Sequence, residues 1–307
     1  MVFTGAARQS HAQETMPMRL PILALLAFPF LFFCLSIPAG GHPHIRDLAR
    51  GQEVAATDFI AALQEVRLVF VGEEHDHDGH HAMQAAIIRA LKERAPERNA
   101  IAVGLEMFQA DFQWALDKWV AGDLTEADFQ PLYARNWSMW PTYRPIFLLA
   151  RDRGVPLLGL NISRDLTRQV ARHGFASLSE EQRRGLHGIA CRVDPAYENF
   201  IRRALGGHGH GTRDFTHFCE AQLLWDAAMA RNLLQFLEKN PETRVVVLAG
   251  SGHSWKYGIP HQISQHAEIT YRVVLPEVRG RIDRDSATAA DGDFLWLDAG
   301  PEGWRLP

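Results

Sequence analysis

Short, uninterrupted apolar runs alternate along the chain with longer segments in which apolar residues recur every three or four positions. Four of the runs end in polar residues: RLVFVGE (67–73), AIAVGLEM (100–107), VPLLGLN (155–161) and TRVVVLAGSGH (243–253). Continuous apolar runs of this length predict strands that are buried on both faces, because a half-exposed strand alternates polar and apolar positions. Two later segments are also predicted to be strands, ITYRVVLPEV (269–278) and DFLWLD (293–298).

Helical periodicity fills the intervals between the first three runs. In HHAMQAAIIRALKERA, the residues Met83, Ile87 and Leu91 fall on one helical face, and DFQWALDKWVAG and YRPIFLLARDRG also carry helical patterns. Strands and helices in this alternating order predict an α/β fold, with a mostly parallel β-sheet flanked by helices. Residues 163–241 break the alternation with one helical segment after another, which predicts a helical subdomain or lid inserted before the fourth strand.

An uncharged apolar segment precedes the predicted domain. It reads LPILALLAFPFLFFCLSI (20–37), follows Arg19, and is followed by small residues suited to cleavage near Ala39 to Gly41. These features are typical of a secretory signal peptide. The segment is also just long enough to span a bilayer if it is not removed, so a membrane anchor is the competing interpretation.

This segment sets the expected localisation and domain limits. We expect residues 1–41 to be a signal peptide or membrane anchor, residues 42–307 to be the folded domain, and the protein to be periplasmic or otherwise exported. Cys34 would be the acylated residue of a lipoprotein, but Phe33 stands before it where lipidation sites have a small residue. A lipid anchor is therefore the less favoured alternative.

Two cysteines remain in the domain, Cys191 and Cys219. An oxidising compartment permits a disulfide between them. Neither cysteine lies in a metal-type Cys-x-x-Cys motif, and two buried thiols are the alternative interpretation.

Composition and charge narrow the class of protein. The chain has 307 residues, of which 47% are hydrophobic and 22% charged, so it can bury a full core, and we expect one large domain or one domain with a small subdomain. The formal net charge of −4 offers no basic face that could neutralise many phosphates. We therefore expect no nucleic-acid partner.

Residues that can carry chemistry follow each of the four strand runs. They are Glu73, Glu74 and His75 after the first, Glu106 after the second, Asn161 after the third, and Ser251 and His253 after the fourth. In an open parallel sheet the ligand crevice lies beyond the carboxyl ends of the strands. We therefore expect these four segments to meet at one pocket.

Two Gly-x-x-His motifs, GEEH (72–75) and GSGH (250–253), lie at two of these strand ends. A glycine three residues before each histidine allows the backbone to turn sharply and present the side chain. Together with the carboxylates, they predict a divalent metal site with the ligands Glu73, His75, Glu106 and His253. Alternatively, the residues Glu73, Glu106 and His253 are catalytic, with a carboxylate as general base on water and a protonated histidine or the metal stabilising the developing charge.

Structural roles are the alternative for the same residues. Glu73 and Glu106 close buried strands and need partners, which arginines could supply without any catalytic role. His253 could be an ordinary loop histidine. Asn161 is expected to be a turn or helix-capping residue before SRDL.

The remaining histidines of VGEEHDHDGHH (71–81) have weaker claims. Asp78 is a good N-cap for the next helix, and His77 is expected to face solvent. His80 lies in line with the apolar helix face, whereas His81 lies on another side. Two further histidines, His208 and His210, lie in a Gly/His stretch that is expected to be a solvated loop.

Five separate blocks of the sequence, taken together and in order, resemble the ChaN-like family of iron-regulated haem-binding proteins in the haem-uptake and Tiki superfamily. The blocks are VFVGEEHDHDGHHAMQAAIIRAL, VGLEMFQADFQWALDKWVAG, NWSMWPTYRPIFLLARDRGVPLLGLNISRDL, FCEAQLLWDAAMARNL and VVVLAGSGHSWKYGIPHQI. The resemblance covers about residues 55–280. It implies a role in bacterial iron acquisition, a homodimer that shelters haem, and contact with outer-membrane or periplasmic iron-uptake components.

The resemblance also implies which residues bind haem. Tyrosine holds the iron in this family, which makes Tyr143 in WPTYRP the first candidate, with Arg144 beside it. Tyr257 and Lys256 in SWKYGIP are the second candidates, and His81 is a further one.

More distant members of the superfamily, the Tiki proteases and erythromycin esterases, use paired Gly-x-x-His motifs for hydrolysis. This likeness carries over to Glu73, His75, Glu106 and His253. A divalent-metal-dependent hydrolase is therefore the alternative to a haem-binding protein.

Overall fold

The computed structural model of the protein describes residues 43–95, 100–186, 189, 193–204, 212–297 and 306, and gives only the backbone for 212–214. Gly40–Pro307 forms one compact unit. Several predictions fall outside the described residues: the signal or anchor segment, Cys191 of the predicted disulfide, and His208 and His210. Cys219 is buried.

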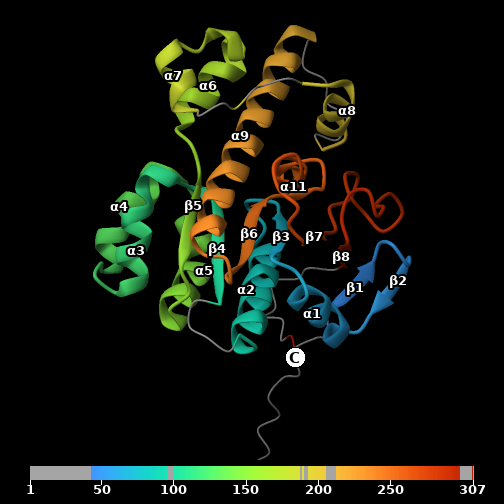
Figure 1. Ribbon diagram of the computed structural model, residues 1–307. Coiled ribbons are helices and arrows are strands. Elements are labelled where there is room, and N and C mark those ends of the chain that lie inside the picture. Colours follow the sequence, from blue (N-terminus) through green and yellow to red (C-terminus); the bar gives the residue numbers. More distant parts are fainter. Residues whose placement is uncertain are drawn as a thin grey trace, which may run out of the picture. The chain divides into compact units, whose positions relative to one another are not determined.

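One sheet runs through the described part of the chain, with the strand order β2-β1-β8-β7-β3-β6-β4-β5 (Figure 1). Its strands are β1 His44–Asp47, β2 Gln52–Val54, β3 Leu68–Glu73, β4 Ile101–Gln109, β5 Leu157–Asn161, β6 Arg244–Gly250, β7 Tyr271–Pro276 and β8 Phe294–Leu297. The strands from β8 to β5 pair in parallel, whereas β1 pairs antiparallel with both β2 and β8. The predicted α/β fold with a mostly parallel sheet is confirmed.

The edge hairpin β1–β2 was not predicted from the sequence. Its strands are short and largely polar, and they are partly exposed. Such a hairpin lacks the apolar run by which buried strands are recognised. The fourth predicted strand is also shorter than its apolar run, because the chain turns into the short helix α10 (Ser251–Ser254) directly after Gly250.

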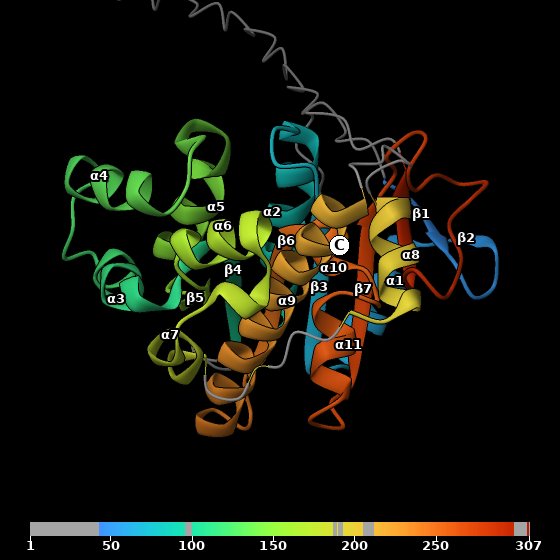
Figure 2. The same ribbon diagram turned by 90° about the horizontal axis from the view of Figure 1, so that it is seen from above.

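Helices cover both faces of the sheet, as the view from above shows (Figure 2). One face packs against α1 Ala56–Gln64, α2 Asp78–Glu93, α3 Gln113–Ala121, α4 Glu126–Asn136 and α5 Trp140–Arg153. The other packs against α8 Pro195–Ala204, α9 Thr212–Lys239 and α11 Ile259–Ser264. Further helical elements are α6 Arg164–His173, α7 Glu180–Gly185, and the 3₁₀ turns η1 Ala110–Phe112 and η2 Phe175–Ser177.

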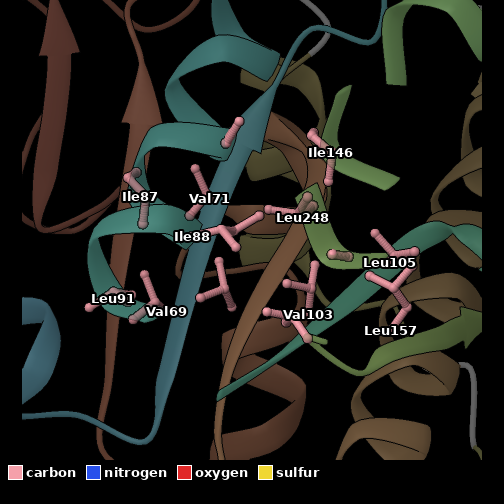
Figure 3. Packing of buried hydrophobic residues seen from close by; sticks show 14 of the residues in the cluster. Val69, Val71, Ile87, Ile88, Leu91, Val103, Leu105, Ile146, Leu157 and Leu248 are labelled. Carbon is pink, nitrogen blue, oxygen red and sulfur yellow. The ribbon is translucent and has the colours of Figure 1, made fainter. Parts of the chain in front are cut away.

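The central strands are buried on both sides, as their continuous apolar runs predict. In β3, Val69 and Val71 face the α2 side, whereas Leu68 and Phe70 face the α9 side. Figure 3 shows the first set packed against Ile87, Ile88 and Leu91 of α2. Alternate residues of one strand thus enter two different cores.

Helix α9 is the longest of the described helices and lies along the sheet. Its residues Met229 and Leu233 are fully buried in the core on that face. The helices α6 and α7 lie on one side of its N-terminal half and α8 on the other (Figure 1). The helical segment between β5 and β6 therefore covers the sheet and also reaches its carboxyl end.

The strand order places the two Gly-x-x-His motifs side by side. The strand β6 lies between β3 and β4 and pairs in parallel with both. In this register Glu73 of the first motif is opposite Gly250 of the second. The chain therefore leaves a gap between β3 and β4 that β6 fills later, and such a switch in strand order opens a crevice at the carboxyl ends.

In the part of the chain that the structure describes, no helix is both long enough and apolar enough to cross a membrane.

Candidate functional site

A cavity of about 550 Å³ opens at the carboxyl ends of β3, β4 and β6. Its floor is polar and consists mainly of Glu73, His75, Glu106, Gly250, Ser251 and His253. Its walls are mostly apolar and include Trp137, Ile201, Phe218, Trp225, Trp255, Val278 and Ile282. At the rim, Arg281 lies 3.4 Å from a carboxylate oxygen of Glu74. The structure thus brings together the strand-end residues of three of the four predicted segments, whereas Asn161 of the remaining segment does not line the cavity.

The first histidine of the floor is held from behind by a buried carboxylate. Nδ1 of His75 lies 2.7 Å from Oε1 of Glu73, which is only 2% exposed. The hydroxyl of Tyr143 donates a short hydrogen bond to the same oxygen and lies 3.1 Å from Nδ1 of His75. These contacts leave Nε2 of His75 directed away from Glu73, and the side chain is 34% exposed.

Helix α2 supports the same carboxylate. Nε2 of Gln84 donates to Oε2 of Glu73 at 2.7 Å, and Nδ1 of His81 lies 3.4 Å from that oxygen. His81 also contacts the backbone carbonyl of His75 through Nε2 at 3.1 Å. Glu73 is therefore enclosed by hydrogen-bonding groups, as a buried carboxylate must be.

The second histidine of the floor is held in the same way from the other side. Nδ1 of His253 lies 2.7 Å from Oδ1 of Asp226, a residue of α9 that is 1% exposed. The other oxygen of Asp226 accepts a hydrogen bond of 2.7 Å from the hydroxyl of Tyr197 in α8. The imidazole of His253 is thereby oriented by a carboxylate that comes from the helical segment.

Glu106 lies between the two imidazoles. It occupies the stretch of β4 in which the pairing with β5 shifts register, an irregularity that can re-aim side chains. Its Oε2 accepts a hydrogen bond of 2.7 Å from the backbone N–H of Gly250. Its Oε1 lies 3.9 Å from Nε2 of His75 and 3.7 Å from Nε2 of His253, and none of the described residues donates a hydrogen bond to it. Two imidazoles and one carboxylate oxygen therefore face one another across a gap.

Gly250 is required where it stands. A Cβ atom at this position would lie 3.1 Å from Nε2 of His75 and 3.6 Å from Oε2 of Glu106. A side chain here would therefore occupy the gap between the imidazole and the carboxylate, which gives a physical reason for glycine in the second motif.

The charges of the floor follow from these contacts. Burial lowers the pKa of the His75 imidazole, but the charge of Glu106 and the hydrogen bond to Glu73 outweigh burial and raise that pKa to about 8. Burial likewise lowers the pKa of His253, and Glu106 and Asp226 raise it to about 9. Burial raises the pKa of Glu73, yet its hydrogen bond to His75 and the neighbouring imidazoles hold it below its ordinary value. Both imidazoles are therefore cationic at neutral pH.

Each imidazole also has an indole against it. The rings of His75 and Trp137 meet edge to face at 5.0 Å, and those of His253 and Trp225 at 5.7 Å. The indole N–H groups of both tryptophans are buried, and no described residue accepts a hydrogen bond from them. Behind this wall a second, apolar cavity of about 290 Å³ shares both tryptophans, and the guanidinium of Arg164 lies 4.6 Å from the ring centre of Trp137.

The predicted four-residue metal site is not assembled as expected. Among the described residues, no group of three or more His, Cys, Asp or Glu side chains is arranged to hold a metal ion. Glu73 contacts Nδ1 of His75, whereas Glu106 faces Nε2 on the opposite side of the ring. One ion therefore cannot bind both Glu73 and Nε2 of His75 in this arrangement. Glu73 orients the histidine instead.

The predicted tyrosine ligand is also placed differently. Tyr143 is fully buried below the cavity floor, and its hydroxyl donates to Glu73. Burial and the negative charge of Glu73 raise the pKa of this phenol far above its ordinary value, so it stays protonated. In this arrangement Tyr143 does not present an oxygen to the cavity, and its role as an axial ligand stays a prediction.

The basic residues and other candidates taken from the family resemblance lie away from the cavity lining. Arg144 is bound in a two-pronged ion pair to Glu126 on the surface. Lys256 donates to Asp293, and His81 is buried behind the floor. The last candidate is Tyr257, which is exposed and stacks on Phe200 of α8.

The histidines that follow the first motif are structural. His77, rather than Asp78, caps α2, because its Nδ1 accepts the backbone N–H of His80. The rings of His77 and His80 stack at 3.8 Å, so the predicted solvent exposure of His77 holds only in part. His80 is buried and accepts the backbone N–H of Glu74 through Nδ1. Burial lowers its pKa to about 3, so it stays neutral.

Asn161 was expected to be a turn or helix-capping residue, and it is not the cap of the following helix. Ser163 caps α6, whereas the buried amide of Asn161 donates to the backbone carbonyl of Glu106 at 2.8 Å. Asn161 therefore supports the irregular part of β4 that carries Glu106.

Two residues of the site were missed from the sequence, Asp226 and Tyr197. Asp226 stands among apolar residues in LLWDAAMA, and a single acidic residue on a buried helix face is a signal that could have identified it. Tyr197 offers no comparable signal, because a tyrosine in an amphipathic helix is ordinary.

Comparisons with known proteins place this site in context. The family model described as haem-binding uptake, Tiki superfamily, ChaN matches residues 59–263, roughly two thirds of the chain. A solved structure described as cofacial haem binding to ChaN of Campylobacter jejuni is 22% identical, with a TM-score of 0.61, and the match covers 83% of this chain and 96% of that one. A structure of a mutant of the erythromycin esterase EreC in its open conformation is 16% identical, with a TM-score of 0.46 and 76% coverage of both chains.

A curated plant relative is also similar. The protein RETICULATA-RELATED 5, chloroplastic, of Arabidopsis thaliana is 24% identical over 261 residues, which cover 77% of this chain. The match spans 35% of the length of that relative, so the chain corresponds to about a third of it.

Proposed function

Because the chain belongs to the ChaN family of the Tiki superfamily, we propose that it is a haem-binding protein that serves iron acquisition. The observation that carries the proposal is that the matched residues include most of the lining of the strand-end cavity, where imidazoles form part of the floor and tryptophans form part of the walls. Apolar walls with a few polar groups are typical of sites for large planar cofactors.

The residues of the cavity fit such a group. His75 offers Nε2 to the cavity, and Glu73 holds Nδ1 on the other side of the ring, the arrangement that raises the basicity of a histidine ligand. Trp137 and Trp225 provide flat apolar surfaces with buried N–H donors that lack acceptors among the described residues. When bound, haem would supply ferric iron with imidazole as the ligand. His75 must lose the proton on Nε2 before it can bind the iron.

The proposed function includes export of the protein from the cytoplasm. The apolar segment at residues 20–37 and the family membership support a periplasmic or otherwise exported protein that hands haem to iron-uptake components. A dimer of the chain belongs to the same proposal, since it is an expectation from the family resemblance.

Titration of the purified protein with hemin tests this proposal. We expect a Soret band with a defined stoichiometry, and an affinity that falls about tenfold or more in His75→Ala, because the iron loses its ligand. Binding should strengthen between pH 7 and pH 9, since the pKa of His75 is raised to about 8 and only the neutral imidazole binds iron.

Two further variants serve as controls for this titration. Arg144→Gln should leave the affinity unchanged, because Arg144 is bound to Glu126 away from the cavity. Tyr143→Phe should keep the Soret band at its wild-type position. If Tyr143→Phe abolishes the band and His75→Ala does not, tyrosine is the ligand and the site rearranges; no spectral change in the wild type would refute haem binding.

A second function, hydrolysis, is favoured by one specific observation. Oε1 of Glu106 receives no hydrogen bond from the described residues, and two cationic imidazoles face it at 3.7 and 3.9 Å. A carboxylate oxygen and two imidazole N–H groups therefore meet at one place on the cavity floor, and these are the groups that general acid–base catalysis uses.

The chemistry of this second function can be written for the residues themselves. Glu106 would take a proton from a water molecule in the gap as that water attacks a carbonyl carbon. Nε2–H of His253 or His75 would stabilise the oxygen on which negative charge develops, and would then protonate the leaving group. The proton held by Glu106 returns to the imidazole and completes the cycle.

Hydrolysis of p-nitrophenyl esters tests the second function. We expect Glu106→Gln to lower the turnover about a hundredfold, because general base catalysis contributes on this order. Glu126→Gln, on the surface, is the matched control and should leave turnover unchanged. Assays with and without EDTA show whether a divalent ion takes part, and an unchanged rate in Glu106→Gln would rule out Glu106 as the base.

A further inference from the structure

Two sets of hydrogen-bonded side chains, here called arms, reach the cavity from opposite sides. Each arm consists of a tyrosine, a carboxylate and a histidine, in that order. In the first arm, Tyr143 donates to Glu73, and Glu73 holds Nδ1 of His75. In the second arm, Tyr197 donates to Asp226, and Asp226 holds Nδ1 of His253. Both arms end with Nε2 of a histidine facing Oε1 of Glu106.

The two arms come from unrelated parts of the fold. The first is built from the end of the central strand β3, the turn after it, and α5, which packs on the α2 side of the sheet. The second is built from α8, α9 and α10 on the opposite side. The two sets share the Gly-x-x-His motif that carries each histidine, whereas the tyrosine and the carboxylate of each arm come from different elements in a different chain order.

From this geometry we propose that Asp226 and Tyr197 are positioning residues of the site, which fix His253 so that its Nε2 atom faces Glu106. The inference rests on the proposed role of the cavity as the functional site. It assigns a purpose to the helical segment between β5 and β6, because α8 and α9 supply the residues that orient one half of the floor.

Burial argues against a purely structural role for Asp226. The carboxylate is 1% exposed, and burying a charge that far from water is destabilising unless the charge is well paired. An apolar residue of similar size would satisfy the packing of α9 without that cost. Both carboxylate oxygens are instead used, one for the histidine and one for the phenol, at 2.7 Å each.

The hydrogen bond determines which ring nitrogen faces the cavity. With Nδ1–H donated to Asp226, the ring cannot rotate without losing that bond, so Nε2 is held toward Glu106. Tyr197 in turn holds the second oxygen of Asp226 and prevents the carboxylate from rotating. Removing Asp226 would leave the ring without its Nδ1 partner and free to turn.

Proton NMR of protein labelled with ¹⁵N-histidine tests the inference directly. Ring N–H protons in short bonds to carboxylates resonate at low field, so we expect one such signal from His253 and one from His75. Asp226→Asn should remove the His253 signal and leave the His75 signal in place. Asp226→Glu should restore it in part, whereas Glu73→Gln should remove only the His75 signal.

Tyr197→Phe provides a second, milder variant in case Asp226→Asn does not fold. It removes one hydroxyl, keeps the carboxylate, and should shift the His253 signal while the His75 signal stays unchanged. His253→Gln assigns the resonance. A His253 signal that is unchanged in Tyr197→Phe and, where that variant folds, in Asp226→Asn would overturn the inference.

The same variants separate this inference from the proposed function. Loss of a residue that orients a ligand or catalytic histidine commonly costs 10- to 100-fold in affinity or activity, so Asp226→Asn should weaken hemin binding or ester hydrolysis by about tenfold. If the wild-type protein neither binds hemin nor hydrolyses esters, the proposed functions fail. The NMR signals still decide whether Asp226 orients His253.

Discussion

Glu73→Ala should lower the free energy of unfolding by about 3–5 kcal/mol, the range expected when one member of a buried charge cluster is removed. Glu73 is almost completely buried. Its two oxygens serve His75, Tyr143 and Gln84. The substitution leaves these groups buried without their acceptor, and it opens a cavity beneath the strand end.

Urea denaturation followed by circular dichroism measures this loss. Glu73→Gln should lose less than Glu73→Ala, because it keeps the volume and one oxygen. Glu126→Ala is the matched control: its carboxylate forms an exposed ion pair with Arg144, and such pairs contribute little to stability. Equal midpoints for Glu73→Ala and Glu126→Ala would show that the Glu73 network does not stabilise the fold.

The stability of the protein should fall by about 3 kcal/mol between pH 6.5 and pH 9 through His253 alone, because its pKa is raised to about 9 from an ordinary value near 6.5. A raised pKa means that the folded state holds the proton more tightly than the unfolded state. The resulting stabilisation is complete below about pH 6.5 and is lost as the pH rises through about 9. His75, with a pKa of about 8, acts in the same direction.

Thermal unfolding at pH values from 6 to 9 measures this dependence. The groups around His253 are Asp226 and Glu106, which favour its protonated form, and His75, which lies across Glu106. His253→Gln should therefore flatten the alkaline part of the curve. A wild-type melting temperature that is constant between pH 6.5 and pH 9 would contradict the proposed charge state of the floor.

Much of the fold could be predicted because a strand that is buried on both faces appears in the sequence as a continuous apolar run. The strands β3 to β6 are continuous apolar runs, and Met83, Ile87 and Leu91 mark the buried face of α2. The polar edge strands β1 and β2 contain no continuous apolar run, so they were not predicted. Local sequence patterns identify buried segments, but they do not identify a strand that is partly exposed.

The candidate site could likewise be predicted only in part. Glu73, His75, Glu106 and His253 could be singled out, because they follow apolar runs whose carboxyl ends meet at one edge of a parallel sheet. Their roles could not be predicted. Glu73 could either bind a ligand together with His75 or orient the His75 ring, depending on which ring nitrogen of His75 it contacts. That contact is set by the χ angles of the two side chains and by the packing of α5 and α2 behind them.

The sequence by itself thus determined the buried strands of the sheet, its two apolar faces and the edge at which the polar residues of the site lie, since these follow from periodicity and from residue types close together in the chain. Only the tertiary structure decided that Tyr143 is buried beneath the floor and that Asp226, 27 residues before His253, belongs to the site. The physical reason is that hydrogen bonds between side chains from different elements depend on how α5, α8 and α9 pack on the sheet. No local pattern records that packing.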